Sequence, residues 1–318
     1  MTLPPLLVIA GATATGKTGL SLQVGESLRG EGIPAEIISA DSRQVYRGLD
    51  IATAKVSAAD RARVPHHGLD LVDPDQPFSV ADFVRHARGA LSTIAAGGGL
   101  AILVGGTGLY LRAVARGLDV EGLPSDPELR ARIDAALIED GLEAAVERLR
   151  QLAPALANST DLRNSRRVSR ALEIAELAGD VERPPLNTYP GPATWLGLSV
   201  PTETHRAWIG ERARVQFAAG LIEEAAALRQ RWDPALPAFS AIGYREAWSV
   251  LDGTLDRDAA IAEDARRNLA FARRQGTWFR SEPGIRWIDA VAEDPHATAL
   301  AEARHLVEQA RSTTSAPR

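Results

Sequence analysis

The 318-residue chain contains no cysteine, which excludes disulfide bonds, thiolate zinc sites and cysteine nucleophiles. Basic residues are not in excess, because 36 lysines and arginines stand against 41 aspartates and glutamates. The resulting net charge of −5 argues against bulk attraction to nucleic acid, although local basic patches remain possible. Membrane-spanning apolar runs are also missing. The N-terminal run Leu6–Ala10 is too short to span a bilayer and has no basic leader, so we expect a buried strand in a cytoplasmic protein without membrane contact.

What is present is an ordinary globular composition, with 45% apolar and 24% charged residues. The length suffices for one large domain or two modest ones. We expect a monomer, because no sustained apolar interface is visible, and a disordered tail over residues 312–318.

The most specific motif follows the run Leu6–Ala10 and precedes a helical pattern. It reads G-x-x-x-x-G-K-[ST], a phosphate-binding loop (P-loop), and comprises Gly11, Ala12, Thr13, Ala14, Thr15, Gly16, Lys17 and Thr18. Backbone N–H groups and the next helix N-terminus would surround phosphates. Lys17 is expected to reach the terminal phosphates, and the Thr18 hydroxyl to bind Mg²⁺. The sequence therefore predicts a di- or triphosphate ligand.

Short apolar runs alternate with helical patterns over the first 115 or so residues, as in a parallel α/β sheet. Strands are expected at 6–10, 35–40, 69–72 and 100–104, and again at 195–200 and 285–289. Helices are expected at 18–28 and 79–95, the second opened by a capping box of Ser79 and Asp82.

A capping box over Ser125–Glu128 opens a helical stretch that runs to about Leu186. We therefore predict a P-loop NTPase-like parallel α/β core at 1–121, a helical insertion domain at 122–190, and the rest of the core with a mainly helical C-terminal region at 191–311.

Asp41 follows the second expected strand, which places it at the sheet edge that carries the P-loop. A carboxylate there suits a general base near the reacting phosphate. The alternative is an aspartate that caps a helix N-terminus.

The expected strand 100–104 ends in Gly105-Gly-Thr-Gly108, without the acidic residue that holds Mg²⁺ and polarises water in common ATPases. This argues for a small transferase, and we expect the glycines to let a second substrate approach the backbone. A metabolite kinase and other phosphate-substrate transferases remain open on this evidence.

Two arginine clusters point to RNA. Arg163, Arg166, Arg167 and Arg170 follow helical spacing and should share one face. The alternatives are a solvated helix face or a kinase lid.

The second cluster mixes arginines with aromatic residues, a combination that suits RNA phosphates and splayed bases. It consists of Arg266, Arg267, Phe271, Arg273, Arg274, Trp278, Phe279 and Arg280. By contrast, His66 and His67 lack partners at metal-ligand spacing, so we interpret them as structural.

Taken in order, these motifs resemble the bacterial tRNA dimethylallyltransferase (tRNA isopentenyltransferase) family over nearly the whole chain. The matching segments are 11–18, 41–46, 50–55, 65–67, 78–83, 104–110, 126–128, 166–173, 241–244 and 273–280. The resemblance implies transfer of dimethylallyl from its diphosphate to N6 of the adenosine directly 3′ of the anticodon, in tRNAs that read codons beginning with U.

The same resemblance implies roles for individual residues. Lys17, Thr18 with Mg²⁺, and Arg212 would stabilise the departing diphosphate, and Asp41 would accept the N6 proton. The base would enter a channel between core and insertion. The residues that would contact the tRNA are Asp41, Ser42, Arg43, Gln44, Thr107, Arg130, Arg166, Arg167, Arg170, Ser240, Gly243, Tyr244, Arg245, Arg273 and Arg274. Among these, Arg130, Arg166, Arg167 and Arg170 would hold the anticodon stem-loop, and the residues from Ser240 onward would meet the tRNA elsewhere.

Three positions depart from the family pattern: Ala52 stands where glycine is usual, and Asn268 and Leu269 replace Thr-Arg. Three rival functions are a small-molecule kinase, an enzyme that prenylates free adenine nucleotides, and a non-catalytic RNA-binding module. The intact Lys17, Thr18 and Asp41 argue against the last, and the long arginine-bearing insertion favours a macromolecular acceptor over a free nucleotide.

Overall fold

The computed structural model describes residues 3–120, 122–181 and 188–315, and the chain divides into two compact units. Unit 1 comprises residues 1–116 and 188–318, and unit 2 comprises residues 117–187. These boundaries lie within five residues of the insertion limits that the sequence suggested. The two units are described separately below.

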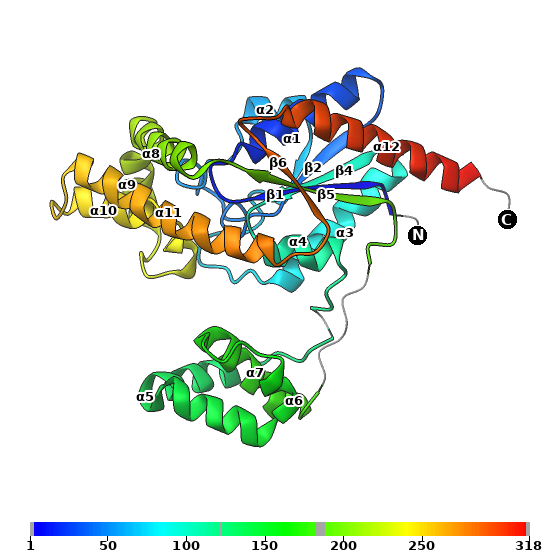
Figure 1. Cartoon of the computed structure of the whole chain (residues 1–318). Helices are drawn as coiled ribbons and strands as arrows, with labels where there is room; N and C mark the ends of the chain where they lie inside the picture. Colours follow the sequence, from blue (N-terminus) through cyan, green and yellow to red (C-terminus); the bar gives the residue numbers. More distant parts are fainter. Residues whose placement is uncertain (1–2, 121, 182–187, 316–318) are drawn as a thin grey trace. The chain divides into compact units, whose positions relative to one another are not determined.

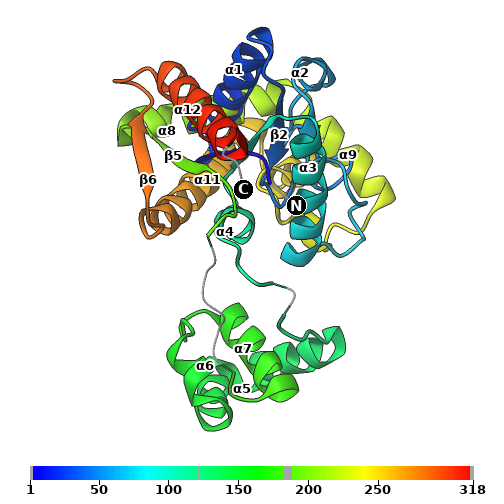
Figure 2. The same ribbon diagram turned by 90° about the vertical axis from the view of Figure 1, so that its right-hand side faces the viewer.

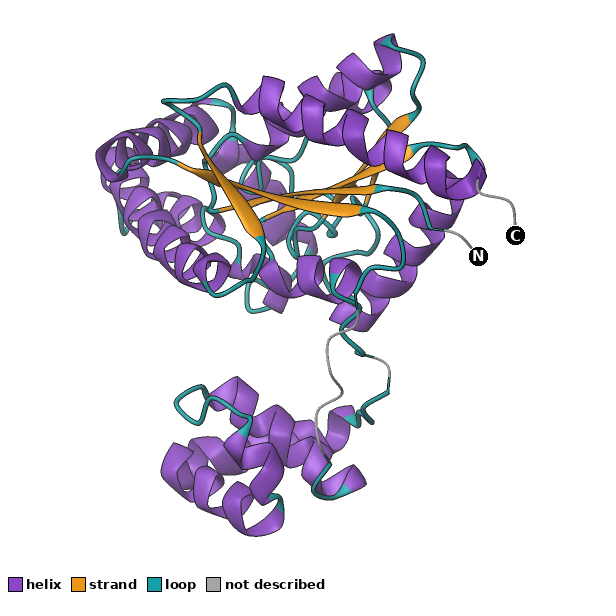
Figure 3. Ribbon diagram, turned by 45° about the vertical axis from the view of Figure 1, so that its right-hand side comes forward, coloured by secondary structure: helices purple, strands orange, loops and turns teal. Residues whose placement is uncertain are grey.

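Unit 1 is built on a six-stranded parallel sheet in the order β3-β2-β4-β1-β5-β6 (Figure 3). The strands are β1 (Leu6–Gly11), β2 (Ala35–Ser39), β3 (His66–His67), β4 (Leu100–Gly105), β5 (Ala193–Ser199) and β6 (Ile285–Asp289). This confirms the predicted parallel α/β fold. The carboxyl ends of β1, β2 and β4 lie together at one edge, where ligands bind in open α/β sheets.

Helices cover both faces of this sheet (Figures 1 and 2). The helices of unit 1 are α1 (Lys17–Gly30), α2 (Ala58–Arg63), α3 (Val80–Ala96), α4 (Gly108–Ala115), α8 (Thr202–Ala218), α9 (Leu221–Arg231), α10 (Tyr244–Leu251), α11 (Arg257–Arg280), α12 (Pro295–Ser315) and the 3-10 turn η1 (Pro237–Ser240). Alternate β1 side chains explain the two layers: Leu7 and Ile9 pack with α1 and α12, whereas Leu6 and Val8 pack with α3, α4 and Phe279 of α11.

A further apolar cluster in unit 1 joins α8, α9, α10 and the loop after β2. Tyr244 and Phe217 are buried at its centre, and Phe239 contacts Tyr244 and Trp248 edge-on. This cluster fixes the loop after β2 against helices that lie nearly 200 residues later in the chain.

Unit 2 consists of α5 (Pro127–Leu152), α6 (Pro154–Asn158) and α7 (Ser165–Ala178), packed around Ile133, Leu149 and Leu172. The predicted capping box is wrong in one respect. The N-cap is Asp126, whose Oδ1 accepts from the N–H groups of Glu128 and Leu129, while the Ser125 hydroxyl donates to Glu173 instead. The end of the predicted helical stretch, at 182–186, lies outside the described residues.

Two other predictions need correction. Residues 69–72 do not form a strand; the third strand is His66–His67, and the later segment pairs with the Gln44–Val45 backbone as a loop, with Asp70 at φ 54°. The predicted disordered tail is helical as far as Ser315, because buried Leu306 and Val307 anchor α12. In the part of the chain that the structure describes, no helix is long and apolar enough to cross a membrane.

Candidate active site

The P-loop connects β1 to α1 as the motif predicts. Gly16 occupies the N-cap of α1 with φ 88°, a conformation that glycine adopts without strain. Ala14 also has a positive φ, 59°, which is uncommon for a residue with a Cβ. The loop therefore holds a constrained shape around the start of α1, as a phosphate cradle requires.

Three residues from distant elements hold Thr13 at the tip of the loop. Its N–H donates to Gln275 Oε1 (2.8 Å), its carbonyl accepts from His205 Nε2 (2.8 Å), and its hydroxyl accepts from Arg212 Nη1 (3.0 Å). The sequence pointed only to Arg212, because neither Gln275 nor His205 lies in a local pattern that signals a loop contact. The tip is thereby locked by α8 and α11.

Asp41 lies at the carboxyl end of β2, as predicted, and caps a turn rather than a helix. Its Oδ1 accepts from the Arg43 N–H at 2.8 Å and from the Gln44 N–H at 3.4 Å. Gln44 in turn bridges the Ser39 hydroxyl (2.8 Å) and the Thr53 carbonyl (3.1 Å). The contacts of Asp41 exclude the helix-cap interpretation, because both N–H donors belong to a turn.

The loop at 50–54 is held by side chains of α8 and α9. Glu224 accepts from the Ile51 N–H (2.8 Å) and from the Tyr244 hydroxyl (2.7 Å). Gln216 donates to the carbonyls of Ile51 (2.6 Å) and Ala52 (2.8 Å). Ala52, which replaces the usual glycine, is buried here without displacing these hydrogen bonds.

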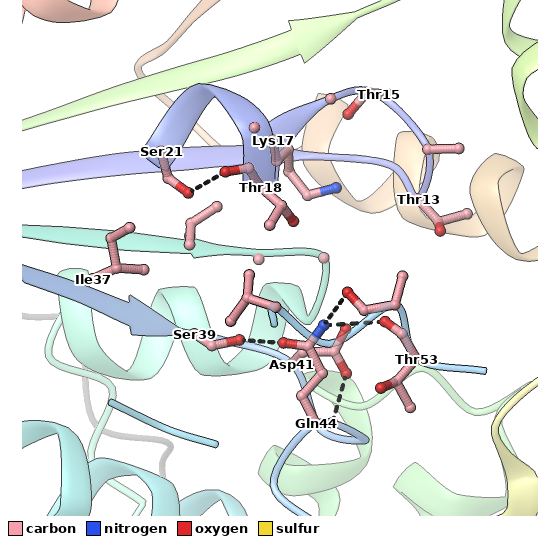
Figure 4. A pocket seen from close by; sticks show the side chains of 18 of the residues that line it. Thr13, Thr15, Lys17, Thr18, Ser21, Ile37, Ser39, Asp41, Gln44 and Thr53 are labelled. Atoms are coloured by element: carbon pink, nitrogen blue, oxygen red, sulfur yellow. Dashed lines mark hydrogen bonds between the residues drawn. The ribbon is translucent and has the colours of Figure 1, made fainter. Parts of the chain in front are cut away.

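The P-loop and the Asp41 loop face each other across a cavity of about 230 Å³. Figure 4 shows Thr13, Lys17 and Thr18 on one wall and Asp41, Gln44 and Thr53 on the other. The remaining lining residues are Ala14, Thr15, Gly16, Gly19, Ser21, Ile37, Ser39, Ala54, Val56, His66, Val104, Gly105, Gly106, Arg212, Phe271 and Gln275. The four residues expected to be catalytic are therefore brought together: Lys17, Thr18, Asp41 and Arg212.

The cations of this cavity, Lys17 and Arg212, form no ion pair with any residue that the structure describes. The Lys17 ammonium donates to the Ala12 carbonyl at 2.5 Å, and burial, with nearby Arg212, lowers its pKa to about 7, although Asp41 acts in the opposite direction. Burial also lowers the pKa of Arg212, whose buried Nε has no partner among the described residues. Such a site gains most from an anionic ligand.

The glycines after β4 are needed for packing within the protein. A Cβ on Gly105 would lie 2.1 Å from the Ala40 carbonyl oxygen, one on Gly106 would lie 2.3 Å from Gln275 Nε2, and one on Gly108 would overlap the Trp278 ring. Protein atoms occupy the positions where these Cβ atoms would lie, so the packing requires glycine at all three places. Gly105 and Gly106 also line the cavity, and close approach of a second substrate to their backbone stays a prediction.

Several predicted RNA contacts around the Asp41 loop are engaged within the protein. Thr107 Oγ1 accepts from the Ser42 N–H (3.1 Å), and Arg43 donates to the Pro237 carbonyl (2.9 Å). Gly243 and Tyr244 are buried, so their predicted contact with RNA needs correction: they support the loop at 50–54. Ser240 and Arg245 are exposed, and their contact with RNA stays a prediction.

The arginines of unit 2 do not form the single predicted face. Arg163 precedes α7, and Arg167 lies 3.5 Å from Asp161. Arg130 and Arg170 both bind the fully buried Glu173 carboxylate, at 2.6 and 2.5 Å. Arg166 is exposed and has no ion pair with another described residue.

The second arginine cluster lies along α11. Arg266 and Arg267 pair with Glu263 and Glu246, whereas Arg273 and Arg274 are exposed without ionic partners among the described residues. Phe279 is 1% exposed and belongs to the core, so it cannot stack on a base. Trp278 packs beneath Arg112 and is only partly exposed. Phe271, which is 37% exposed, lines the cavity.

The two adjacent histidines face opposite sides of the sheet. His67 pairs with Glu36 (2.6 Å), which agrees with a structural role, whereas His66 lines the cavity. The alternation of side chains along a strand is the one local signal that could have separated the two histidines. In the described residues no cluster of three or more acidic, histidine or cysteine side chains forms a metal site.

Comparison with known proteins identifies relatives of this chain. A family model described as IPP transferase matches residues 44–282. A tRNA dimethylallyltransferase of Roseiflexus sp. (strain RS-1) is 41% identical over 314 residues, which cover 96% of this chain and 99% of the relative. One from Anaeromyxobacter dehalogenans is 44% identical and covers 92% of this chain and 97% of the relative.

Solved structures agree with these matches. The full-length tRNA isopentenylpyrophosphate transferase of Bacillus halodurans is 34% identical, with a TM-score of 0.69 and coverage of 97% of both chains. A eukaryotic dimethylallyltransferase acting on tRNA has a TM-score of 0.70 at 22% identity and shares the fold.

Proposed function

The chain belongs to the IPP transferase family, and we infer that it transfers a dimethylallyl group from dimethylallyl diphosphate to an adenosine of tRNA. The observation that carries this function is the cavity in which unpaired Lys17 and Arg212 face the Asp41 carboxylate. Cations that lack an anion suit a diphosphate, and a carboxylate opposite them suits a proton acceptor. Relatives of 41% and 44% identity carry the same activity in their names.

The diphosphate end of the donor binds at the P-loop. Backbone N–H groups at the start of α1 point toward the phosphates, and Lys17 exchanges the Ala12 carbonyl for a phosphate oxygen. Arg212 approaches from the other side of Thr13. These groups stabilise negative charge that grows on the leaving diphosphate in the transition state.

Transfer is a displacement at the allylic carbon. The adenine N6 forms a bond to C1 of the dimethylallyl group while the bond from C1 to the diphosphate oxygen breaks, and the diphosphate keeps the electron pair. The N6 proton passes to Asp41, whose loop is held by Gln44 and by the backbone of Arg43. Because an adenine amine is a weak nucleophile, placement of N6 beside C1 supplies much of the rate.

A magnesium ion fits the diphosphate end. The Thr18 hydroxyl faces the cavity and donates no hydrogen bond to another described residue, and Mg²⁺ prefers hydroxyl, phosphate and water oxygens. When bound, the ion would neutralise charge on the diphosphate. Lys17 and Arg212 are the protein groups that neutralise charge on the diphosphate.

The acceptor is proposed to be the adenosine directly 3′ of the anticodon, turned out of its stack to reach Asp41. Four of the arginines predicted to contact RNA are exposed and have no ionic partner among the described residues, which makes them candidates for phosphate contacts on the tRNA: Arg166, Arg245, Arg273 and Arg274. Net charge of the whole chain is negative, so binding depends on these local groups.

The first test measures transfer of labelled dimethylallyl from its diphosphate to an anticodon stem-loop that carries three consecutive adenosines, with AMP and ATP as parallel acceptors. We expect label on RNA alone. Label on free nucleotide would assign the chain to nucleotide prenylation, and ATP consumption without any labelled product would indicate a kinase.

The role of Asp41 is tested by Asp41→Asn, which keeps the Oδ1 acceptor for the Arg43 N–H but removes the base. We expect kcat to fall about 10²- to 10⁴-fold, with stem-loop binding unchanged. Asp73→Asn, at an exposed aspartate that pairs with Arg47, is the matched control. Near-normal turnover in Asp41→Asn would reject the proton-acceptor role.

A further inference from the structure

The active-site cavity continues beyond the phosphates into a recess along the sheet. From β2 the lining residues are Ser39 and, two residues further from the P-loop, Ile37, while β3 contributes His66. Two strand residues correspond to roughly 7 Å of depth. No lining residue comes from further down these strands, so the recess ends at the level of Ile37 and His66.

The walls of this recess differ from the mouth of the cavity. Ile37, Val56 and Val104 supply apolar surface, and Ala54 adds a methyl group, whereas the mouth presents Lys17, Asp41 and Arg212. The hydroxyls of Ser21 and Ser39 also line the recess, but they donate to the Thr18 carbonyl and to Gln44 Oε1. A ligand with a charged head and a short apolar tail matches this division. The proposed donor, dimethylallyl diphosphate, has this character, and the inference below rests on that proposed function.

His66 is fixed where the recess ends. The β2–β3 register pairs it with Ile37, so both side chains lie on the same face of the sheet. Its Nδ1–H donates to the Val64 carbonyl at 2.7 Å, and burial lowers its pKa, which favours the neutral ring. Its Nε2 is buried and has no hydrogen-bond partner among the described residues.

The residue behind His66 prevents the ring from moving back. Val64 is 0% exposed and packs against α1 at Gly25, where a Cβ would lie only 2.9 Å from Val64 Cγ1. The backbone that carries His66 is thus packed against a helix with no spare space. A longer ligand tail would have to displace the ring itself, at the cost of its bond to Val64.

We propose that the His66 ring ends the prenyl recess and determines donor length, admitting the five-carbon dimethylallyl tail and excluding the ten-carbon geranyl tail. The residue acts through steric limits on the tail and takes no part in bond making. Val56, on the side wall, contributes to the same limit.

The test is a calorimetric titration of the full chain, in magnesium buffer, with inorganic diphosphate, dimethylallyl diphosphate and geranyl diphosphate. The wild-type protein is expected to bind geranyl diphosphate at least about tenfold more weakly than the dimethylallyl donor. In His66→Ala this ratio should shrink about tenfold or more, with affinity for inorganic diphosphate unchanged. Val56→Ala should shift the ratio in the same direction.

The matched control is His67→Ala, the neighbouring histidine on the opposite face of the sheet, which should leave the ratio unchanged. Val56→Ala keeps the test available if His66→Ala unfolds. Equal binding of both prenyl diphosphates by the wild type, or an unchanged ratio in both variants, would overturn the inference. Normal donor binding without transfer to RNA would instead reject the proposed function, and the binding ratios would still decide the role of His66.

Discussion

The partly buried cations at the P-loop cavity of unit 1 and those around Glu173 of unit 2 have different surroundings. In unit 1, Lys17 and Arg212 contact only neutral oxygens, and burial lowers the pKa of each. In unit 2, Arg130 and Arg170 share the fully buried Glu173 carboxylate. Despite the opposing effect of its burial, hydrogen bonds from Arg170 and Arg130 lower the pKa of Glu173.

This difference distinguishes cations that bind a ligand from cations that stabilise the fold. A desolvated cation without an anion costs free energy in the folded protein, and an anionic ligand recovers that cost. A cation bound to a buried carboxylate instead holds helices together.

Lys17→Ala should reduce kcat/KM for the dimethylallyl donor about 10³-fold, because it removes a charge from the leaving diphosphate. The free energy of unfolding of this variant should not fall, because the substitution removes a cation whose desolvation destabilises the folded protein. The matched variant is Lys55→Ala: the chain's other lysine is buried between Asp50 and Asp70, each at 2.7 Å. We expect that variant to lose stability. Equal destabilisation of both variants in urea unfolding would contradict the distinction between a lysine at the P-loop and a lysine paired with carboxylates.

Glu173→Ala should lower the free energy of unfolding of unit 2 by about 3 kcal/mol, because Arg130, Arg170 and the Asp126 N–H lose their shared acceptor. Hydrogen exchange across α5 and α7 measures this loss locally. Inorganic diphosphate should bind with unchanged affinity, since the P-loop lies in unit 1. A parallel loss of diphosphate affinity would contradict the separation of roles.

The pKa of about 7 for Lys17 gives stability and binding opposite pH dependences. In the unfolded chain a lysine keeps its proton up to about pH 10.4. Between about pH 7 and about pH 10.4 the unfolded state therefore binds more protons than the folded state. The free energy of unfolding of the ligand-free protein then rises with pH, by up to about 1.4 kcal/mol per pH unit from this group. Diphosphate prefers the charged lysine, so its affinity should fall above pH 7. Calorimetry in two buffers should detect proton uptake, which Lys17→Met should abolish.

Arg166→Ala should weaken stem-loop binding a few-fold and reduce its salt dependence, because an exposed arginine without an ionic partner among the described residues is free for phosphate. Its free energy of unfolding should stay within about 0.5 kcal/mol of the wild type. Arg170→Ala, one helical turn away, should instead lower stability through Glu173. Salt titrations of RNA binding and thermal unfolding separate the two outcomes.

Much of the fold and part of the site were predictable from local pattern. The P-loop, the alternation of strands and helices, the capping box of Ser79 and Asp82, and the position of Asp41 all depend on residues a few positions apart. The predictions were wrong where contacts between residues far apart in the sequence determine the local structure. Residues 69–72 carry a strand-like composition, but Gly68 and Asp70 adopt positive φ and the segment pairs with the Asp41 loop.

From the amino-acid sequence alone one could predict the P-loop, the carboxylate after the second strand and the motifs of the IPP transferase family. The residues that hold the P-loop and line the cavity became visible only in the folded structure. Gln275 and His205 clamp Thr13 from 262 and 192 residues away, and His66 rather than His67 lines the cavity. Local patterns record interactions along a few turns or strand positions, whereas these contacts exist only once the sheet has brought its loops together.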